Sequence, residues 1–257
     1  MSSAGTGGEH AVHPHSLLQA FQSLLFLLAI ALFIITFVAQ PFRIPSASME
    51  PTLLVGDFLL VNKQISSSRF PALAPANLVR RGDLIVFHFP VDPSKDLVKR
   101  VVGLPGDRIR LRDGRVILDG RALTEPYAVF RTAAPDSYRD DFPRVDRADP
   151  AADSRWWIQM HGLVSQGELT IPPDSYFVLG DNRNDSEDSR YWGLVPRAAI
   201  VGKPFLIYFS MNQPDADSAP GAFPAADLQA NQAARQHGSF ASLLHFARWG
   251  RTLRILR

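Results

Sequence analysis

Three polar segments of the chain combine residue types that can carry out covalent chemistry. The first, residues 45–53, places the hydroxyls of Ser46 and Ser48 two positions apart, between Pro45 and Pro51. Proline fixes its own backbone and restricts the residue before it, so this stretch is stiff and either extended or turning. A serine-rich loop without a chemical role fits the same residues, and this segment alone leaves both interpretations open.

The second segment, residues 96–107, carries Lys99 inside an apolar stretch typical of a β-strand. Side chains alternate faces along a strand, so Lys99 shares a face with Leu97 and Val101. If that face is exposed, the ammonium group is simply solvated. If it is buried, the lysine must be paired or neutral, because burial lowers a lysine pKa from about 10.4 by up to about 3–5 units. A neutral amine of this kind can act as a general base.

The third segment, residues 180–193, follows a predicted strand and is too polar for a protein core. It contains Ser186, Asp188 and Arg190. The segment is interpreted either as a solvated surface loop or as a loop that supplies hydrogen bonds to charged or reactive groups.

An uncharged stretch near the N-terminus predicts a membrane anchor. No Asp, Glu, Lys or Arg occurs between Glu9 and Arg43, and residues 17–39 contain neither Gly nor Pro. At about 1.5 Å per residue, a helix over this range reaches roughly 35 Å and exceeds a hydrocarbon core of about 30 Å. The stretch is too long for a cleaved signal peptide, whose apolar region has about 7–15 residues. We therefore predict an uncleaved transmembrane helix at 17–39 after a short head, residues 1–16.

The remaining chain is predicted to be mainly β. Short apolar or alternating runs bounded by turn residues indicate strands at 58–62, 84–89, 97–102, 108–111, 116–118, 176–179 and 205–209. Asp113-Gly114 is a hairpin signal, because both residues tolerate the positive φ of a type I′ turn. We expect a β-rich, partly barrel-like core over 40–121 and 169–257.

Two parts of this region differ in composition. Residues 122–168 are rich in Asp, Arg, Pro and Ala, and are predicted to form an inserted β subdomain. Residues 212–238 are rich in Ala, Gln, Asp and Pro, which is typical of a loop or linker. The basic and apolar tail that follows fits an interfacial helix or a final strand, and the β character of the domain favours the strand.

Composition excludes several functional classes. The 257 residues include no Cys, which excludes disulfides, thiolate metal sites and a cysteine nucleophile. A formal charge of +2 gives no reason to expect a nucleic-acid partner. His10, His13 and His15 lie on a proline-containing polar head without a carboxylate pair, so we expect neither a metal site nor a cofactor.

In this order behind an apolar anchor, the three segments resemble the bacterial type I signal peptidases, membrane-anchored Ser-Lys endopeptidases that remove signal peptides from exported proteins. The shared motifs are Ser-x-Ser-Met-x-Pro-Thr-Leu, Lys-Arg-Val-Val-Gly-x-Pro-Gly-Asp, and Gly-Asp-Asn-Arg followed by Ser-x-Asp-Ser-Arg. One motif alone is moderately specific, whereas the three together are very specific. The resemblance covers most of the chain except residues 122–168 and 212–238.

The resemblance implies that Ser48 is the nucleophile and Lys99 its general base. Serine is a weak nucleophile until a neighbouring base takes its proton. No His lies in the three segments, whereas a desolvated lysine supplies a base. Lowering a lysine pKa by about 3 units costs roughly 4 kcal/mol, which the fold and bound substrate must sustain.

Supporting roles for other polar side chains also follow from the resemblance. Ser46 matches a side-chain donor of an oxyanion hole, beside the backbone N–H of Ser48, and such a donor is worth about 10²–10³ in rate. Ser186 matches the position that orients the lysine amine. Asp188, paired with Arg190, matches the position that holds this loop.

One departure from the family pattern lies next to these residues. Many members have Arg-Asp-Asn-Ser where this chain has Arg183-Asn184-Asp185-Ser186, with the amide and the acid exchanged. The spacing to Ser186 is kept, so the exchange puts local contacts in question rather than activity.

The resemblance predicts a single-pass enzyme of the bacterial inner membrane. Its substrates would be secretory preproteins, cut after small residues of the Ala-x-Ala type, and the lipid bilayer would be its other partner. Because Ser48 follows Ala39 closely, even an extended link keeps it within about 30 Å of the anchor. By the positive-inside rule Arg43 favours a cytoplasmic domain, but long domains cross largely regardless of charge, so the implied function places the catalytic domain outside the cytoplasm.

Two alternatives stand beside a signal peptidase. A specialised Ser-Lys peptidase for one substrate, such as a pilin-processing relative or a self-cleaving repressor, would use the same chemistry, although the anchor speaks against a repressor. An inactive membrane-anchored scaffold would bind secretory proteins without cutting them, but the presence of both Ser48 and Lys99 speaks against it.

Overall fold

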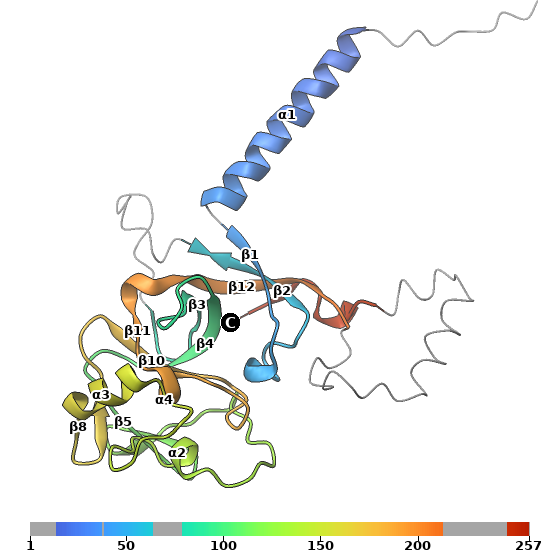
Figure 1. Ribbon diagram of the computed structural model, residues 1–257. Coiled ribbons are helices and arrows are strands. Elements are labelled where there is room, and N and C mark those ends of the chain that lie inside the picture. The colour runs from blue at the N-terminus through green and yellow to red at the C-terminus, as the bar shows by residue number, and fades with distance from the viewer. Residues whose placement is uncertain (1–13, 38, 64–78, 213–245, 257) are drawn as a thin grey trace, which may run out of the picture. The chain divides into compact units, whose positions relative to one another are not determined.

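The computed structural model describes residues 14–37, 39–63, 79–212 and 246–256 (Figure 1). The chain divides into two compact units, Met1–Ala39 and Gln40–Arg257. Residues 1–13 of the expected head, residue 38 of the expected anchor and residues 213–238 of the expected linker lie outside the described residues.

The first unit contains α1, Pro14–Phe37, which covers most of the predicted anchor. Exposed apolar side chains along it include those of Leu18, Phe21 and Leu32. Among the helices that the structure describes, none combines the length and the hydropathy needed to cross a membrane. The predicted transmembrane helix at 17–39 is therefore not confirmed.

The second unit is built around an eight-stranded sheet (Figure 1). The strand order is β1-β2-β12-β3-β4-β10-β11, and β13 also pairs with β12. The bounds are Ala39–Arg43 for β1, Asp57–Asn62 for β2, Leu84–His88 for β3, Asp96–Gly103 for β4, Ser175–Leu179 for β10, Val195–Pro196 for β11, Ile200–Ser210 for β12 and Arg254–Ile255 for β13. The mainly β fold is confirmed, but the order is an open path and the described strands form no closed barrel.

A second sheet has the order β7-β6-β5-β9-β8. Its strands are β5 Arg108–Arg112, β6 Arg115–Leu118, β7 Arg121–Ala122, β8 Val164–Ser165 and β9 Glu168–Thr170. The hairpin predicted at Asp113-Gly114 is confirmed, because Arg112 pairs with Arg115 and φ is 49° at Asp113 and 72° at Gly114.

Residues 122–168 differ from the prediction of an inserted β subdomain. They contribute two helices, α2 Ser137–Asp140 and α3 Ser154–Leu163, with short strand pieces only at the two ends of the segment. The second sheet instead joins strands that precede this segment to strands at its end.

The helices explain why the composition of this segment was misleading. Asp136 and Asp153 are the N-cap residues of α2 and α3, and each side chain accepts hydrogen bonds from two backbone N–H groups. Aspartate is favoured at such caps as well as in turns, so the Asp-rich composition does not distinguish them. Trp156 and Met160, one helical turn apart, bury the inner face of α3 against the second sheet.

Each of the predicted strands overlaps a strand of the structure, namely β2, β3, β4, β5, β6, β10 and β12 in chain order. The preferred prediction for the tail is confirmed at β13, which follows a short 3₁₀ turn, Trp249–Arg251. The other short helical elements are 3₁₀ turns at Ala47–Met49 and Arg197–Ala199 and the helix α4, Ser189–Trp192.

Buried apolar residues fix the segments that carry the candidate residues. Met49 and Leu53, on either side of the Pro51 turn, are fully buried in a cluster with residues of β2 and β3. Val101 of β4 and Val178 of β10 are buried together in a second cluster. All three polar segments are therefore tied to the large sheet.

Candidate active site

The first polar segment forms a loop, residues 44–57, that we call the serine loop. At its base, the Ile44 N–H donates to the Asp57 carbonyl and the Gly56 N–H donates to the Ile44 carbonyl, both at 2.9 Å. The 3₁₀ turn Ala47–Met49 buries Met49 and leaves Ser48 half-buried. The loop thus presents the Ser48 hydroxyl to the neighbouring strands.

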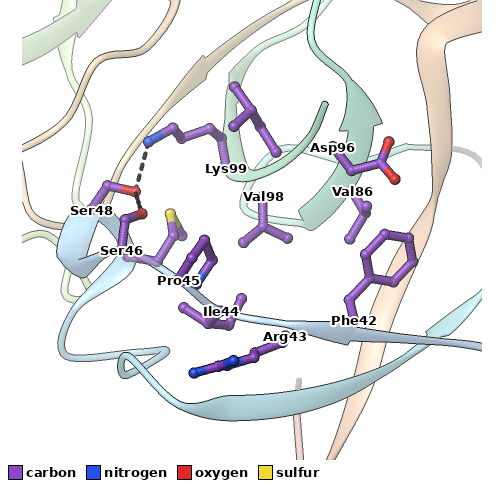
Figure 2. Close-up of a pocket in the computed structure, with 12 residues that line it drawn as sticks. Phe42, Arg43, Ile44, Pro45, Ser46, Ser48, Val86, Asp96, Val98 and Lys99 are labelled. Carbon is purple, nitrogen blue, oxygen red and sulfur yellow. Dashed lines mark hydrogen bonds between the residues drawn. The ribbon is translucent and has the colours of Figure 1, made fainter. Parts of the chain in front are cut away.

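Lys99 lies on β4 and extends toward Ser48 (Figure 2). The residue is only 4% exposed. Its Nζ is 2.8 Å from Ser48 Oγ and 3.0 Å from Ser186 Oγ. The face of β4 that carries Lys99 is therefore buried, and the interpretation of a simply solvated lysine is wrong.

Burial lowers the pKa of Lys99 to about 8, because the charged ammonium loses its hydration. The carboxylate of Asp188 opposes this effect, whereas the guanidinium of Arg190 adds to it. A substantial fraction of the amine is then neutral near pH 8. In that form its lone pair can accept the Ser48 hydroxyl proton across the 2.8 Å contact.

A buried chain of polar groups orients the lysine. Ser186 Oγ donates to Asp188 Oδ2 at 2.9 Å and accepts from Lys99. Asp188 also accepts from Arg190 Nε at 2.8 Å and from the Gly180 N–H at 3.1 Å. Although burial opposes ionisation, the Arg190 guanidinium holds the pKa of Asp188 below its usual range. The predicted Asp188–Arg190 pair is confirmed.

Gly180 lies where the third segment meets the serine loop. A Cβ at this position would stand 2.2 Å from Ser186 Oγ and 2.5 Å from the Ser48 carbonyl oxygen. The Asn182 N–H donates to the same carbonyl at 3.1 Å, and Asn182 Nδ2 donates to the Ala47 carbonyl at 3.3 Å. The third segment therefore holds the backbone of the nucleophile candidate directly.

Ser46 lies beside Ser48 but is exposed. The two hydroxyl oxygens are 3.4 Å apart (Figure 2). Ser46 has extended backbone, with φ −132° and ψ 158°. Its hydroxyl can turn toward an oxygen that develops charge next to Ser48, as an oxyanion-hole donor must. That role stays a prediction.

Arg100 and Asp181 form a second buried ion pair that the sequence analysis did not single out. Arg100 Nε and Nη2 donate to the two carboxylate oxygens of Asp181 at 2.7 and 2.6 Å. Thr52 of the serine loop donates to Asp181 at 2.5 Å. Arg100 follows Lys99 on a strand with two buried faces, so the two side chains lie on opposite faces. Two adjacent cations within an apolar run were the sequence signal that could have indicated a buried ion pair at Arg100.

The beginning of residues 122–168 supports the third segment, a role that composition did not reveal. Glu125 accepts from Arg183 Nη1 and Nη2 at 2.8 and 2.6 Å. The Val129 N–H donates to the Asp181 carbonyl at 2.8 Å, and the Arg183 N–H donates to the Val129 carbonyl at 2.9 Å.

The exchanged pair Asn184-Asp185 lies beside this support. Asn184 is half-buried and Asp185 is exposed. Asp185 accepts a long hydrogen bond, 3.4 Å, from Asn182. Within the described chain, neither residue hydrogen-bonds to Ser48 or Lys99.

Two hollows meet at Ser48 and Lys99. The smaller, with a volume of about 70 Å³, is lined mainly by apolar side chains and is drawn in Figure 2. These include Phe42, Ile44 and Val98. The larger, of about 970 Å³, extends over the third segment.

The described residues include no cluster of three or more His, Cys, Asp or Glu side chains that could hold a metal ion. Of the histidines considered above, His10 and His13 lie outside the described residues.

Comparison with known proteins places these residues within a matched region. A family model described as signal peptidase, peptidase S26, matches residues 17–209. Signal peptidase I of Pseudomonas aeruginosa is 36% identical over 211 residues, which cover 75% of this chain and 72% of the relative. Signal peptidase I of Aquifex aeolicus is 35% identical over 222 residues, 74% of this chain and 84% of the relative. A crystal structure of a signal peptidase I from Enterococcus faecalis, 32% identical, aligns with 48% of this chain and 94% of its own, with a TM-score of 0.35.

Replacing Lys99 with Met is expected to stabilise the protein near neutral pH. The folded-state pKa of about 8 is lower than the ordinary 10.5, so the unfolded chain binds the proton more tightly. Below pH 8 the buried charge therefore destabilises the fold by about 3 kcal/mol, at about 1.36 kcal/mol per pKa unit, and the penalty fades as the pH rises to 10.5.

Urea unfolding as a function of pH measures this effect. For the wild-type chain, the free energy of unfolding should rise between pH 8 and 10.5. For Lys99→Met it should start higher at pH 7 and change less over that interval. Equal slopes for the two proteins would show that Lys99 is not desolvated in the folded state.

Proposed function

The chain belongs to the signal peptidase family, peptidase S26, and from that membership and the geometry of its polar site we propose that Ser48 is the nucleophile and Lys99 the general base. The protein is a serine endopeptidase that removes signal peptides from preproteins. The observation that carries the assignment of roles is the 2.8 Å contact between Lys99 Nζ and Ser48 Oγ at a buried lysine.

Acylation begins when the neutral Lys99 amine takes the Ser48 hydroxyl proton as Oγ attacks the scissile carbonyl carbon. The tetrahedral oxyanion accepts hydrogen bonds from the Ser46 hydroxyl and the Ser48 N–H. Lys99, now an ammonium, returns its proton to the leaving amine. The C–N bond breaks, the mature protein leaves, and the signal peptide stays attached to Ser48 as an ester.

Deacylation repeats the same proton transfers with water. Lys99 takes a proton from the attacking water molecule and then protonates Ser48 Oγ as the ester breaks. Ser186 holds the lysine amine through both steps, because it accepts from Lys99 while donating to Asp188. Asp188 and Arg190 act as positioning residues for Ser186.

Specificity for small residues before the cut is part of the proposal. Its support is the small hollow beside Ser48, which is lined mainly by apolar side chains. β1, which contributes Phe42 to this hollow, ends the strand order of the large sheet. A preprotein segment that adds a strand at this site would place its backbone along the loop that carries Ser48.

We also propose that the protein works at the bacterial inner membrane, anchored by residues 17–39 with the catalytic domain outside the cytoplasm. The support is the uncharged sequence of this stretch and the exposed apolar side chains of α1, such as Leu24 and Leu28. Signal peptides are themselves apolar segments, and their cleavage sites emerge on the far side of the membrane. An anchored enzyme meets them there.

Substitution of either reacting residue tests the proposed mechanism. In detergent solution, Ser48→Ala and Lys99→Ala should each lower cleavage of a preprotein with an Ala-x-Ala site by more than about 10³-fold. Conversion of precursor to mature protein on a gel is the measurement. Ser165→Ala, a matched change at an exposed serine of β8, should leave the rate unchanged. Full activity of either active-site variant would refute the assignment.

A charge in α1 tests the anchor. The full chain should float with phospholipid vesicles and resist an alkaline wash. Leu28→Arg should weaken retention, since a central arginine costs about 2.5–3.5 kcal/mol in a membrane helix. Ile158→Arg, at an exposed apolar residue of α3, is the matched control and should have no effect. Release of the unsubstituted chain by the wash would rule out a spanning anchor.

A further inference from the structure

We propose that Arg251, in the C-terminal segment 246–256, is a positioning residue for the serine loop. The proposal rests on the assignment of Ser48 as the nucleophile. The tail lies far from the three polar segments in sequence, and none of their motifs includes it.

The serine loop has one limb that joins its base to its 3₁₀ turn, and side chains from distant parts of the chain contact this limb. Its base is closed by the pairing of Ile44 with Asp57 and Gly56, and its 3₁₀ turn is held by Asn182. Residues 50–56 connect these two fixed points. A shift of this limb moves Ser48 relative to Lys99, the side chain that must take its proton.

Arg251 contacts this limb at Thr52 and the base of the loop at Asp57. Its Nη2 donates to the Thr52 carbonyl at 3.0 Å and to Asp57 Oδ2 at 2.6 Å. Its Nε lies 3.3 Å from Asp57 Oδ1. A guanidinium is a rigid planar fork, so one side chain fixes the carbonyl and the carboxylate at a set separation.

Arg251 also supplies the charge that Asp57 requires. Asp57 is 0% exposed, and its carboxylate further accepts from the Leu54 N–H at 2.8 Å and from Ser210 Oγ at 2.6 Å. A buried carboxylate without a cation is strongly destabilising. Arg248 completes the cluster, because it donates to the Val55 carbonyl.

The tail is itself firmly held by the large sheet. The Arg248 N–H donates to the Ser210 carbonyl at 2.8 Å, and the Asn212 N–H donates to the Phe246 carbonyl at 2.7 Å. Further along, β13 pairs with β12 at Leu206 and Ile207. The segment is therefore a fixed support for the loop.

Thr52 connects the tail to the catalytic centre. While its carbonyl accepts from the tail, its hydroxyl donates to Asp181 at 2.5 Å. Asp181 directly precedes Asn182, whose N–H holds the Ser48 carbonyl. Displacement of Thr52 would thus reach Ser48 both through the loop backbone and through the third segment, and would change its approach to Lys99.

The substitution Arg251→Lys tests this role in the full chain. A lysine keeps a positive charge beside Asp57 but cannot donate to Asp57 and Thr52 with the fixed geometry of a guanidinium. We expect kcat for preprotein cleavage to fall about tenfold with KM changed less than twofold, because a misplacement of about 1 Å can cost up to 10²-fold in rate. Rates are normalised to the folded fraction from thermal unfolding.

Two further variants make the outcome decisive. Arg254→Lys, at an exposed arginine of β13, is the matched control and should keep the wild-type kcat. The double variant Arg251→Met with Asp57→Asn removes the uncompensated charge, and should fold yet remain slow. A wild-type kcat per folded molecule in Arg251→Lys or in the double variant would overturn the positioning role. Activity in Ser48→Ala would instead overturn the nucleophile assignment beneath it.

Discussion

The contact between a buried lysine amine and a serine hydroxyl constrains the rest of this structure. Lys99 must lose hydration to become a base near neutral pH, and burial lowers its pKa to about 8. If the pKa of Lys99 fell much further, the neutral amine would be too weak a base to take the proton from the serine hydroxyl. The carboxylate of Asp188 limits the decrease, and Ser186 keeps the amine in reach of Ser48. The same burial makes the site a source of instability that the surrounding sheet must offset.

Adjacent residues of β4 serve the site from opposite faces. Lys99 points to Ser48, whereas Arg100 pairs with Asp181. A second buried pair, Asp188 with Arg190, holds the same loop from its other end. Breaking such a pair leaves an uncompensated buried charge, so each ion pair gives the loop one favoured arrangement. The two buried ion pairs therefore fix the loop that positions the Ser48 hydroxyl and the Lys99 amine.

Short-range sequence patterns predicted what depends on neighbours in sequence. The strands and the Asp113-Gly114 hairpin follow from local spacing, and motif resemblance singled out Ser48, Lys99 and the Asp188–Arg190 pair. The helices of residues 122–168 were missed, because aspartate marks helix caps and turns alike. The supports from Glu125 and Arg251 join residues far apart in the chain. No pattern in the sequence predicts such contacts. Only the folded chain brings Glu125 to the third segment and Arg251 to the serine loop.

Direct titration of the lysine amine tests whether Lys99 can serve as the base for Ser48. The chain has four lysines, Lys63, Lys95, Lys99 and Lys203, so NMR with labelled lysine side chains gives few signals, and Lys99→Met identifies the relevant one. The expected midpoint for the Lys99 amine in the folded protein lies near the pKa of about 8. A midpoint near 10.4, the ordinary value for lysine, would contradict it, because Lys99 would then be too fully protonated to act as the base for Ser48.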